Sequence, residues 1–200
     1  MEAVFKYFSY YRKMVSSILA GILISIGGLV YLNVQGVYGS VLFSFGLITI
    51  IYYKLRLFTG KAGFFKLISL SEWFDLFLIL LGNLVGCMIL AYIIGEHDMA
   101  SNLLDDRITD GQTNNFLKAI GCGFIMTLIV NAGRLGNYLM VVFGVAAFIL
   151  CGFYHCIADA YYMFSAESYL RDLYILDYYP LVVLGNLVGC NIPRYLTSNE

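Results

Sequence analysis

The chain has 200 residues, of which 60% are hydrophobic and only 12% are charged, and its mean hydropathy is +0.80. A soluble domain of this size could not bury so much apolar surface, so the composition predicts a membrane protein. The net charge of −1 argues against nucleic acid as a partner.

The apolar runs predict six membrane crossings. A spanning helix needs about 20 apolar residues, and the runs that reach or approach this length are 15–34, 40–53, 73–94, 116–132, 138–164 and 179–196. The first run follows three cations and lacks a small-residue cleavage site followed by polar chain. It therefore reads as a retained helix and not as a signal peptide.

The second and fifth crossings carry polar interruptions. Run 40–53 is too short to cross alone and leads into the polar segment 54–61, which is followed by a second apolar piece, 62–70. Run 138–164 contains Gly152, His155 and Asp159. Irregular backbone is tolerated at membrane depth only where protein or a water-filled cavity surrounds it. Both interruptions therefore predict broken helices beside a cavity.

A six-residue motif, Gly-Asn-Leu-Val-Gly-Cys, occurs twice, at 82–87 and at 185–190. Duplicated membrane units with interrupted segments are typical of transporters and channels. The alternative is two small-residue helix contacts that happen to look alike. The duplication predicts one channel domain over 1–200, with repeats at about 15–95 and 116–197. The motif residues expected to pack closely are Gly82, Asn83, Gly86, Gly185, Asn186 and Gly189.

Charge distribution predicts the orientation. Cations lie at the amino terminus, at Arg134 and at Arg194, whereas segment 95–115 carries five acids against Arg107. Basic ends stay inside, so we expect a multi-pass protein of the plasma (inner) membrane with both termini cytoplasmic. Segment 95–115 becomes an outer acidic loop, in which His97 is expected to be solvated.

His155 is the candidate functional residue of the second half, with Asp159 four positions on. Ionisable groups inside a membrane usually face a cavity and serve function, although a neutral histidine bonded to a backbone carbonyl is the alternative. The five cysteines form no CxxC pair. We therefore expect no metal site and no cofactor.

Several segments together resemble the formate/nitrite transporter family. Segment 152–161, Gly-Phe-Tyr-His-Cys-Ile-Ala-Asp-Ala-Tyr, is similar to that family's Gly-Phe-Glu-His-Ser stretch. Segments 43–48 and 57–60 resemble its Phe-Ser-Leu-Gly-Leu-Ile and Leu-Phe-Thr-Gly motifs, and the two duplicated copies resemble motifs of its third and sixth helices. The resemblance covers nearly the whole chain in the right order.

The resemblance implies an all-α, aquaporin-like fold with six transmembrane helices in two inverted three-helix repeats and broken second and fifth helices. It implies a homopentamer in the lipid bilayer with one pore per protomer, conducting small monovalent anions such as formate, nitrite or hydrosulfide. The implied polar pore residues are His155, Thr59 and Thr127, the last replacing a family asparagine. The implied constriction residues are Phe43 and Phe148 on the outer side and Leu47, Leu57, Phe58 and Val130 on the inner side.

The chain departs from the family pattern at several positions. Arg56 stands where the family has glutamate, Lys61 where it has asparagine, and Tyr154 and Asp159 replace an acid and an asparagine beside the histidine. We expect Lys54, Arg56 and Lys61 to attract anions by long-range electrostatics. The alternative is that they reach lipid headgroups or pair with an acid such as Glu72.

The predicted function is therefore a channel for small weak-acid anions, with a possible proton step at His155. Two other classes stay open: an aquaporin-like pore for small neutral solutes, and a membrane enzyme. The enzyme is disfavoured because no paired carboxylates, nucleophile elbow or metal cluster is present in the sequence.

Overall fold

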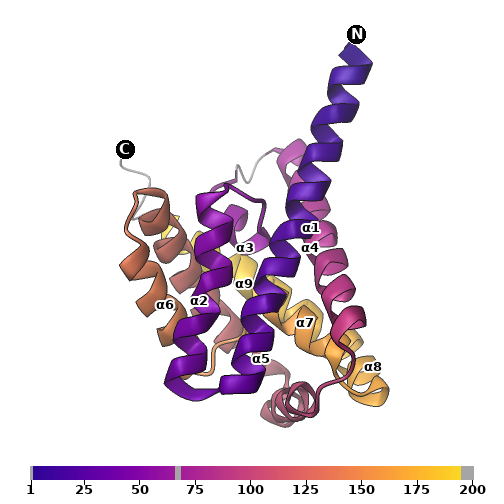
Figure 1. The fold of residues 1–200 in the computed structure, drawn as a ribbon, viewed down its shortest axis with the longest axis vertical. Coiled ribbons are helices and arrows are strands. Elements are labelled where there is room, and N and C mark those ends of the chain that lie inside the picture. Colours follow the sequence, from indigo (N-terminus) through magenta and orange to yellow (C-terminus); the bar gives the residue numbers. More distant parts are fainter. Residues whose placement is uncertain (1, 66–68, 195–200) are drawn as a thin grey trace.

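The protein is described by a computed structural model over residues 2–65 and 69–194, with backbone alone for residues 2–9 and 169. These residues form helices and no strands. The helices are α1 (Glu2–Val34), α2 (Gly36–Tyr52), α3 (Phe58–Ala62), α4 (Leu70–Ile94), α5 (Asp98–Arg134), α6 (Tyr138–Leu150), α7 (Cys156–Ser165), α8 (Ser168–Asp177) and α9 (Tyr179–Asn191). Figure 1 shows α1 and α4 side by side, with α2 and α6 beyond them.

The nine helices of the described residues make up six crossings. Within the described residues, Tyr10–Val34 of α1, α4 and α5 are long and apolar enough to span a bilayer, and α8 with α9 forms a further span bent by 45°. The apolar helices α2 and α6 are shorter, and each is continued after a break, by α3 and α7 respectively. The predicted all-α fold with broken second and fifth crossings is confirmed.

The two asparagines of the duplicated motif hold the two breaks in the same way. Asn83 Oδ1 accepts from the backbone N–H of Phe58 (2.8 Å), and its Nδ2 donates to the carbonyls of Arg56 (2.9 Å) and Ser17 (2.7 Å). Each asparagine is fully buried. Each therefore satisfies loop backbone that the interrupted helix leaves unpaired, as expected from the sequence.

Asn186 repeats this pattern in the second half. Its Oδ1 accepts from the N–H of Cys156 (2.9 Å), and its Nδ2 donates to the carbonyls of Tyr154 (2.8 Å) and Ala119 (2.9 Å). Residues 56 and 58 thus correspond to 154 and 156. The same geometry at corresponding positions is the structural form of the two inverted repeats.

The glycines of the motif allow the helices to approach closely. A Cβ on Gly86 would overlap the carbonyl oxygen of Ile18 on α1, and a Cβ on Gly189 would overlap that of Ile120 on α5. The pairs α1–α4 and α5–α9 accordingly have the most extensive contacts in the structure. Small residues at four-residue spacing produce this close backbone packing in membranes.

The first helical break differs from the expected one. The continuation of the second crossing is α3, at 58–62, and not the apolar piece 62–70, because the Asn83 amide fixes the helix start at Phe58. Leu70 already begins the third crossing, and residues 66–68 lie outside the described part. A short apolar run does not reveal which helix it joins.

The acidic segment is helical and not a loop. The first part of α5, which we call its outer part after the expected orientation, runs from Asp98 to a break at Gly111, where φ is 80° and ψ is 164°. His97 caps this helix by accepting from the N–H of Met99 (3.2 Å), and it is half-buried instead of solvated. Ala100, Leu104 and Arg107 are buried at helical spacing, as on one face of an amphipathic helix. The many acids of this segment hide that pattern in the sequence.

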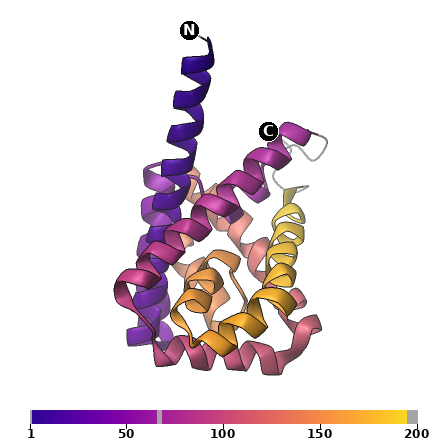
Figure 2. The same cartoon turned by 90° about the vertical axis from the view of Figure 1, so that its right-hand side faces the viewer.

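Two further differences concern the chain's last third. Helix α8 was not expected, and α9 ends at Asn191, whereas the predicted span reached 196, beyond the described residues. The start of α1 and the end of α9 lie at one end of the molecule, and the outer part of α5 crosses the opposite end (Figures 1 and 2).

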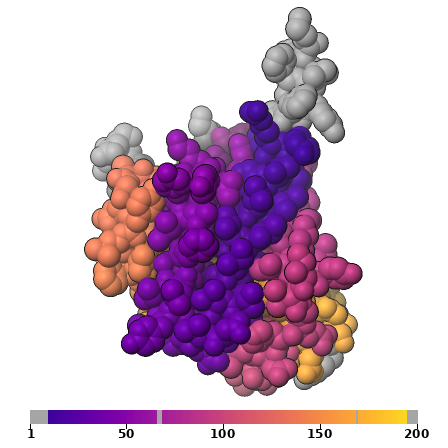
Figure 3. Space-filling view, in the orientation of Figure 1, coloured from indigo at the N-terminus to yellow at the C-terminus, as the bar shows by residue number. Residues whose placement is uncertain are grey.

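Apolar side chains cover the outside of the bundle. Phe45 on α2, Phe77 and Tyr92 on α4 and Phe143 on α6 are each more than half exposed. Figure 3 shows the face on which α1 and α2 lie between α6 and α4. A perimeter of this kind suits lipid or other protomers.

Candidate functional site

The two broken crossings meet at Thr59 and His155. Thr59 lies in the first turn of α3 and His155 immediately precedes α7, and both side chains are almost completely buried. Thr59 Oγ1 lies 2.8 Å from His155 Nε2. This contact joins the halves of the chain at the middle of the fold.

The hydrogen bonds of His155 indicate its tautomer. Its Nδ1 accepts from the backbone N–H of Ala158 (3.2 Å) and therefore carries no proton in the neutral ring. The proton of the neutral ring then lies on Nε2 and is donated to Thr59 Oγ1. In this arrangement the Thr59 hydroxyl keeps its own proton for another acceptor.

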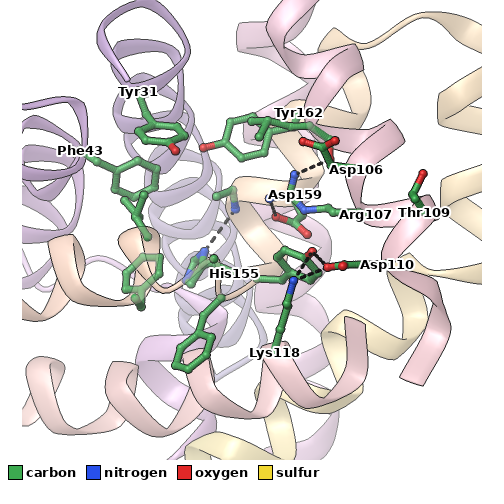
Figure 4. A pocket seen from close by; sticks show the side chains of 17 residues that line it. Tyr31, Phe43, Asp106, Arg107, Thr109, Asp110, Lys118, His155, Asp159 and Tyr162 are labelled. Atoms are coloured by element: carbon green, nitrogen blue, oxygen red, sulfur yellow. Dashed lines mark hydrogen bonds and ion pairs between the residues drawn. The ribbon is translucent and has the colours of Figure 1, made fainter. Parts of the chain in front are cut away.

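A pocket of about 400 Å³ reaches His155 from the end of the molecule where α5 is broken, and we name it the outer pocket after the orientation expected from the sequence. Its walls include Phe43, Phe148, Ala158 and Tyr162. The charged residues that line it are Asp106, Arg107, Asp110, Lys118 and Asp159, as Figure 4 shows. Three acids and two bases thus give this pocket no excess of positive charge.

A second pocket of about 400 Å³, which we name the inner pocket by the same expectation, is lined by residues of α2, α3, α5 and α6. Leu47, Leu57 and Val130 contribute apolar side chains to it, and Lys54 and Arg134 are its two charged lining residues. The Arg134 guanidinium donates to the carbonyl of Gly60 (2.8 Å) in α3. The inner pocket is therefore cationic, in contrast to the outer one.

Apolar residues of α2 lie between the two pockets. Phe43 lines the outer pocket and Leu47 the inner one, four residues or about 6 Å along the helix. The Phe43 and Phe148 rings meet edge to face at 6.3 Å, and Phe148 stacks on His155 at 6.0 Å. The region between the two pockets is thus largely apolar and is bordered by His155.

Some of the residues expected in the pore line neither pocket. Thr127 is buried, donates to the carbonyl of Cys190 (2.8 Å) and lines neither pocket, and its Oγ1 leaves no room for a Cβ on Gly63. Phe58 is buried at the start of α3 and also lines neither pocket. Thr59 also lines neither pocket, but its Oγ1 lies 2.8 Å from His155 Nε2. The other expected pore residues line one pocket or the other: Phe43, Phe148 and His155 the outer one, and Leu47, Leu57 and Val130 the inner one.

The three expected cations have different surroundings. Lys54 lines the inner pocket and adopts a positive φ of 55°. Arg56 instead forms an ion pair with Asp75 (3.2 Å), which Lys13 also contacts (2.6 Å). Lys61 is half-exposed on α3 and lines neither pocket. Arg134 joins Lys54 in the inner pocket, although the sequence had marked it only as an orientation signal.

Sequence reasoning missed the charged cluster of the outer pocket. Arg107 pairs with Asp159 (3.0 Å), while Asp110 receives hydrogen bonds from both Lys118 and Tyr154. The available signal was Arg107 itself, the one cation of an acidic segment and a natural partner for an acid buried elsewhere. Asp159 therefore pairs with Arg107 and does not contact His155 through its side chain.

Comparisons with known proteins agree with this architecture. The sequence model of the formate/nitrite transporter family matches residues 4–194. The chain belongs to the formate/nitrite transporter family. A solved structure described as a pentameric formate channel with formate bound is 22% identical, with a TM-score of 0.83 over 95% of this chain and 96% of that one.

A second family member has the same fold. A structure described as an FNT family ion channel is 23% identical, with a TM-score of 0.81 over 94% of this chain and 90% of that one. A search of curated proteins gave no match. At these identities the structural likeness establishes the fold, while the match over residues 4–194 establishes the family.

Proposed function

We propose that the protein is a membrane channel for small monovalent anions of weak acids, of the formate, nitrite or hydrosulfide class. The observation that supports this most directly is the Thr59–His155 contact between two pockets in a chain of this family. The similar solved structure that holds formate supports the same substrate class.

The inner pocket would collect the anion. Lys54 and Arg134 line it without an accompanying acid, so their field raises the local anion concentration. Lys54 is exposed and the Arg134 guanidinium is anchored on Gly60. The anion would then meet Leu47, Leu57 and Val130 at the entrance to the constriction.

A bare anion would pay a large desolvation cost in this apolar passage. Protonation to the neutral acid removes most of that cost, so we assign the proton step to the neighbourhood of His155. With His155 protonated on Nε2, the Thr59 hydroxyl proton can be donated to a substrate oxygen or sulfur. His155 and Thr59 would thus bind the substrate at the point where its charge changes.

We further propose a homopentamer in the plasma membrane with both termini cytoplasmic. The similar formate channel is described as pentameric, and exposed aromatic residues such as Phe45, Phe77 and Phe143 offer a broad apolar perimeter. Each protomer would contain its own path, since His155 and both pockets lie within one chain. A monomer or dimer as the sole active species in detergent would contradict this assembly.

The test is flux into proteoliposomes. Formate, nitrite, hydrosulfide and lactate are supplied at two pH values, and uptake is compared with that of water and glycerol. Anion uptake that rises at the lower pH supports the proposal. Uptake of glycerol or water without anion uptake would instead identify a neutral-solute pore.

A further inference from the structure

The outer part of α5 forms part of the wall of the outer pocket. The break at Gly111 has a positive φ of 80°, which glycine adopts easily and other residues do not. Asn115 secures the break by donating to the carbonyls of Arg107 (2.6 Å) and Gly111 (2.8 Å). Segment 98–111 consequently runs crosswise at the outer end (Figure 2) and carries Arg107 into the pocket.

Arg107 and Asp159 form a buried ion pair there. Arg107 Nη2 lies 3.0 Å from Asp159 Oδ1, and the Tyr174 hydroxyl donates to Asp159 Oδ2 (2.7 Å). The guanidinium lies over the rings of Tyr154 (4.6 Å) and Tyr162 (5.4 Å). Arg107 is 7% exposed and Asp159 is fully buried, so neither charge is screened well by solvent.

Asp159 stands close to the anion path. It follows His155 by four residues on α7, a rise of about 6 Å, and both residues line the outer pocket. At that separation and an effective dielectric constant of about 20, an unpaired carboxylate would lower the local concentration of a monovalent anion about a hundredfold. A channel for anions with a carboxylate at this position therefore needs a counter-charge.

We propose that Arg107 sets the affinity of the outer pocket for anions by neutralising Asp159. Arg107 is a positioning residue in this role and need not touch the substrate. The inference rests on the proposed anion channel. A purely structural ion pair would not show this behaviour, because here substitution of Arg107 and substitution of Asp159 should change the anion affinity in opposite directions.

The experiment measures the half-saturating concentration and maximal rate of formate and nitrite flux in proteoliposomes. Four proteins are compared with the unchanged chain: Arg107→Gln, Asp159→Asn, the double variant, and Arg171→Gln. Arg171 is a matched control because it lies on α8 beside Asp172 (4.0 Å) and does not line the outer pocket. The oligomer mass of each variant is measured in the same preparations.

Arg107→Gln should raise the half-saturating concentration about tenfold or more, because it leaves the Asp159 charge uncompensated. Asp159→Asn should lower it severalfold, since it leaves Arg107 positive. The double variant should return to within about threefold of the unchanged chain, and Arg171→Gln should change nothing. Removing one partner of a buried pair is strongly destabilising, so Asp159→Asn alone carries the test if Arg107→Gln fails to assemble.

The proposal is overturned if Asp159→Asn raises the half-saturating concentration or leaves it unchanged, or if Arg171→Gln has the effect of Arg107→Gln. The same holds if an assembled Arg107→Gln channel keeps its original half-saturating concentration. Absence of formate and nitrite flux in the unchanged chain is a different result. It would contradict the proposed function itself before any variant is compared.

Discussion

Thr59 and His155 lie 96 positions apart in the chain, yet Oγ1 of the first is 2.8 Å from Nε2 of the second. Each belongs to a different half of the duplicated fold, and each stands at the start of a half-helix that follows a break. The contact exists only when both breaks are held correctly. Correct folding of both breaks would therefore be a condition of the proposed transport.

We expect Thr59→Val to reduce formate flux at least tenfold and Thr59→Ser to retain most of it. Valine has the shape of threonine without the hydroxyl, so it leaves Nε2 of His155 without its acceptor and the substrate without a donor. A buried donor left unpaired costs about 1–3 kcal/mol. The measurement is formate flux into vesicles with matched protein content. Equal flux in the Thr59→Val and Thr59→Ser variants would show that transport does not need the Thr59 hydroxyl.

His155→Asn should change the pH dependence of flux while leaving the oligomer intact. Asparagine keeps a polar side chain at the start of α7 but cannot exchange a proton near neutral pH. Flux is recorded from acidic to neutral pH, and oligomer mass is measured alongside. An unaltered pH profile in a correctly assembled variant would remove His155 from the proton step.

Asn83→Ala should lower the thermal stability of the solubilised protein, and Asn186→Ala should do the same. Each substitution strips partners from one buried N–H and two carbonyls at a helical break, at about 1–3 kcal/mol for each buried group left unpaired. Asn33→Ala is the control, because Asn33 is exposed and its amide bonds only to the carbonyl of Leu29 within α1. Melting points that match the control would contradict the bracing role of the motif asparagines.

Gly86→Leu and Gly189→Leu should prevent assembly of the bundle. Even the Cβ of the new side chain would overlap a backbone oxygen of the neighbouring helix, that of Ile18 for Gly86 and that of Ile120 for Gly189. The backbone cannot move aside as a flexible side chain can. Gly60→Ala provides the comparison, because the nearest atom to its Cβ is Leu57 Cβ at 3.5 Å, an ordinary contact. The yield of monodisperse protein on size exclusion is the measurement, and normal yields of the leucine variants would disprove the close approach.

Lys54→Gln should lower flux more at low than at high ionic strength. Lys54 lines the inner pocket, and salt screens its long-range attraction over about 10 Å at 0.1 M. Arg56→Gln should have a smaller, salt-independent effect, because Arg56 is paired with Asp75 (3.2 Å). Flux at two salt concentrations compares the variants, and equal losses for Lys54→Gln at both would favour a structural role for this lysine.

The sequence alone determined the number of crossings, their apolar character and the duplication. Lipid requires long apolar helices, and such helices leave a signal that composition and length reveal directly. The identity of residues 82–87 with 185–190 also indicated where the repeats correspond. His155 was recognisable because an ionisable group within an apolar run is costly and seldom accidental.

Only the tertiary structure decided which polar groups meet. The start of α3 at Phe58 depends on the amide of Asn83, 25 residues later, and this long-range hydrogen bond leaves no local pattern in the sequence. The pairing of Arg107 with Asp159 likewise requires the turn at Gly111 and the packing of α5 on α7. Local periodicity reports which face of a helix is apolar, whereas the partner of a buried charge is selected by geometry between distant segments.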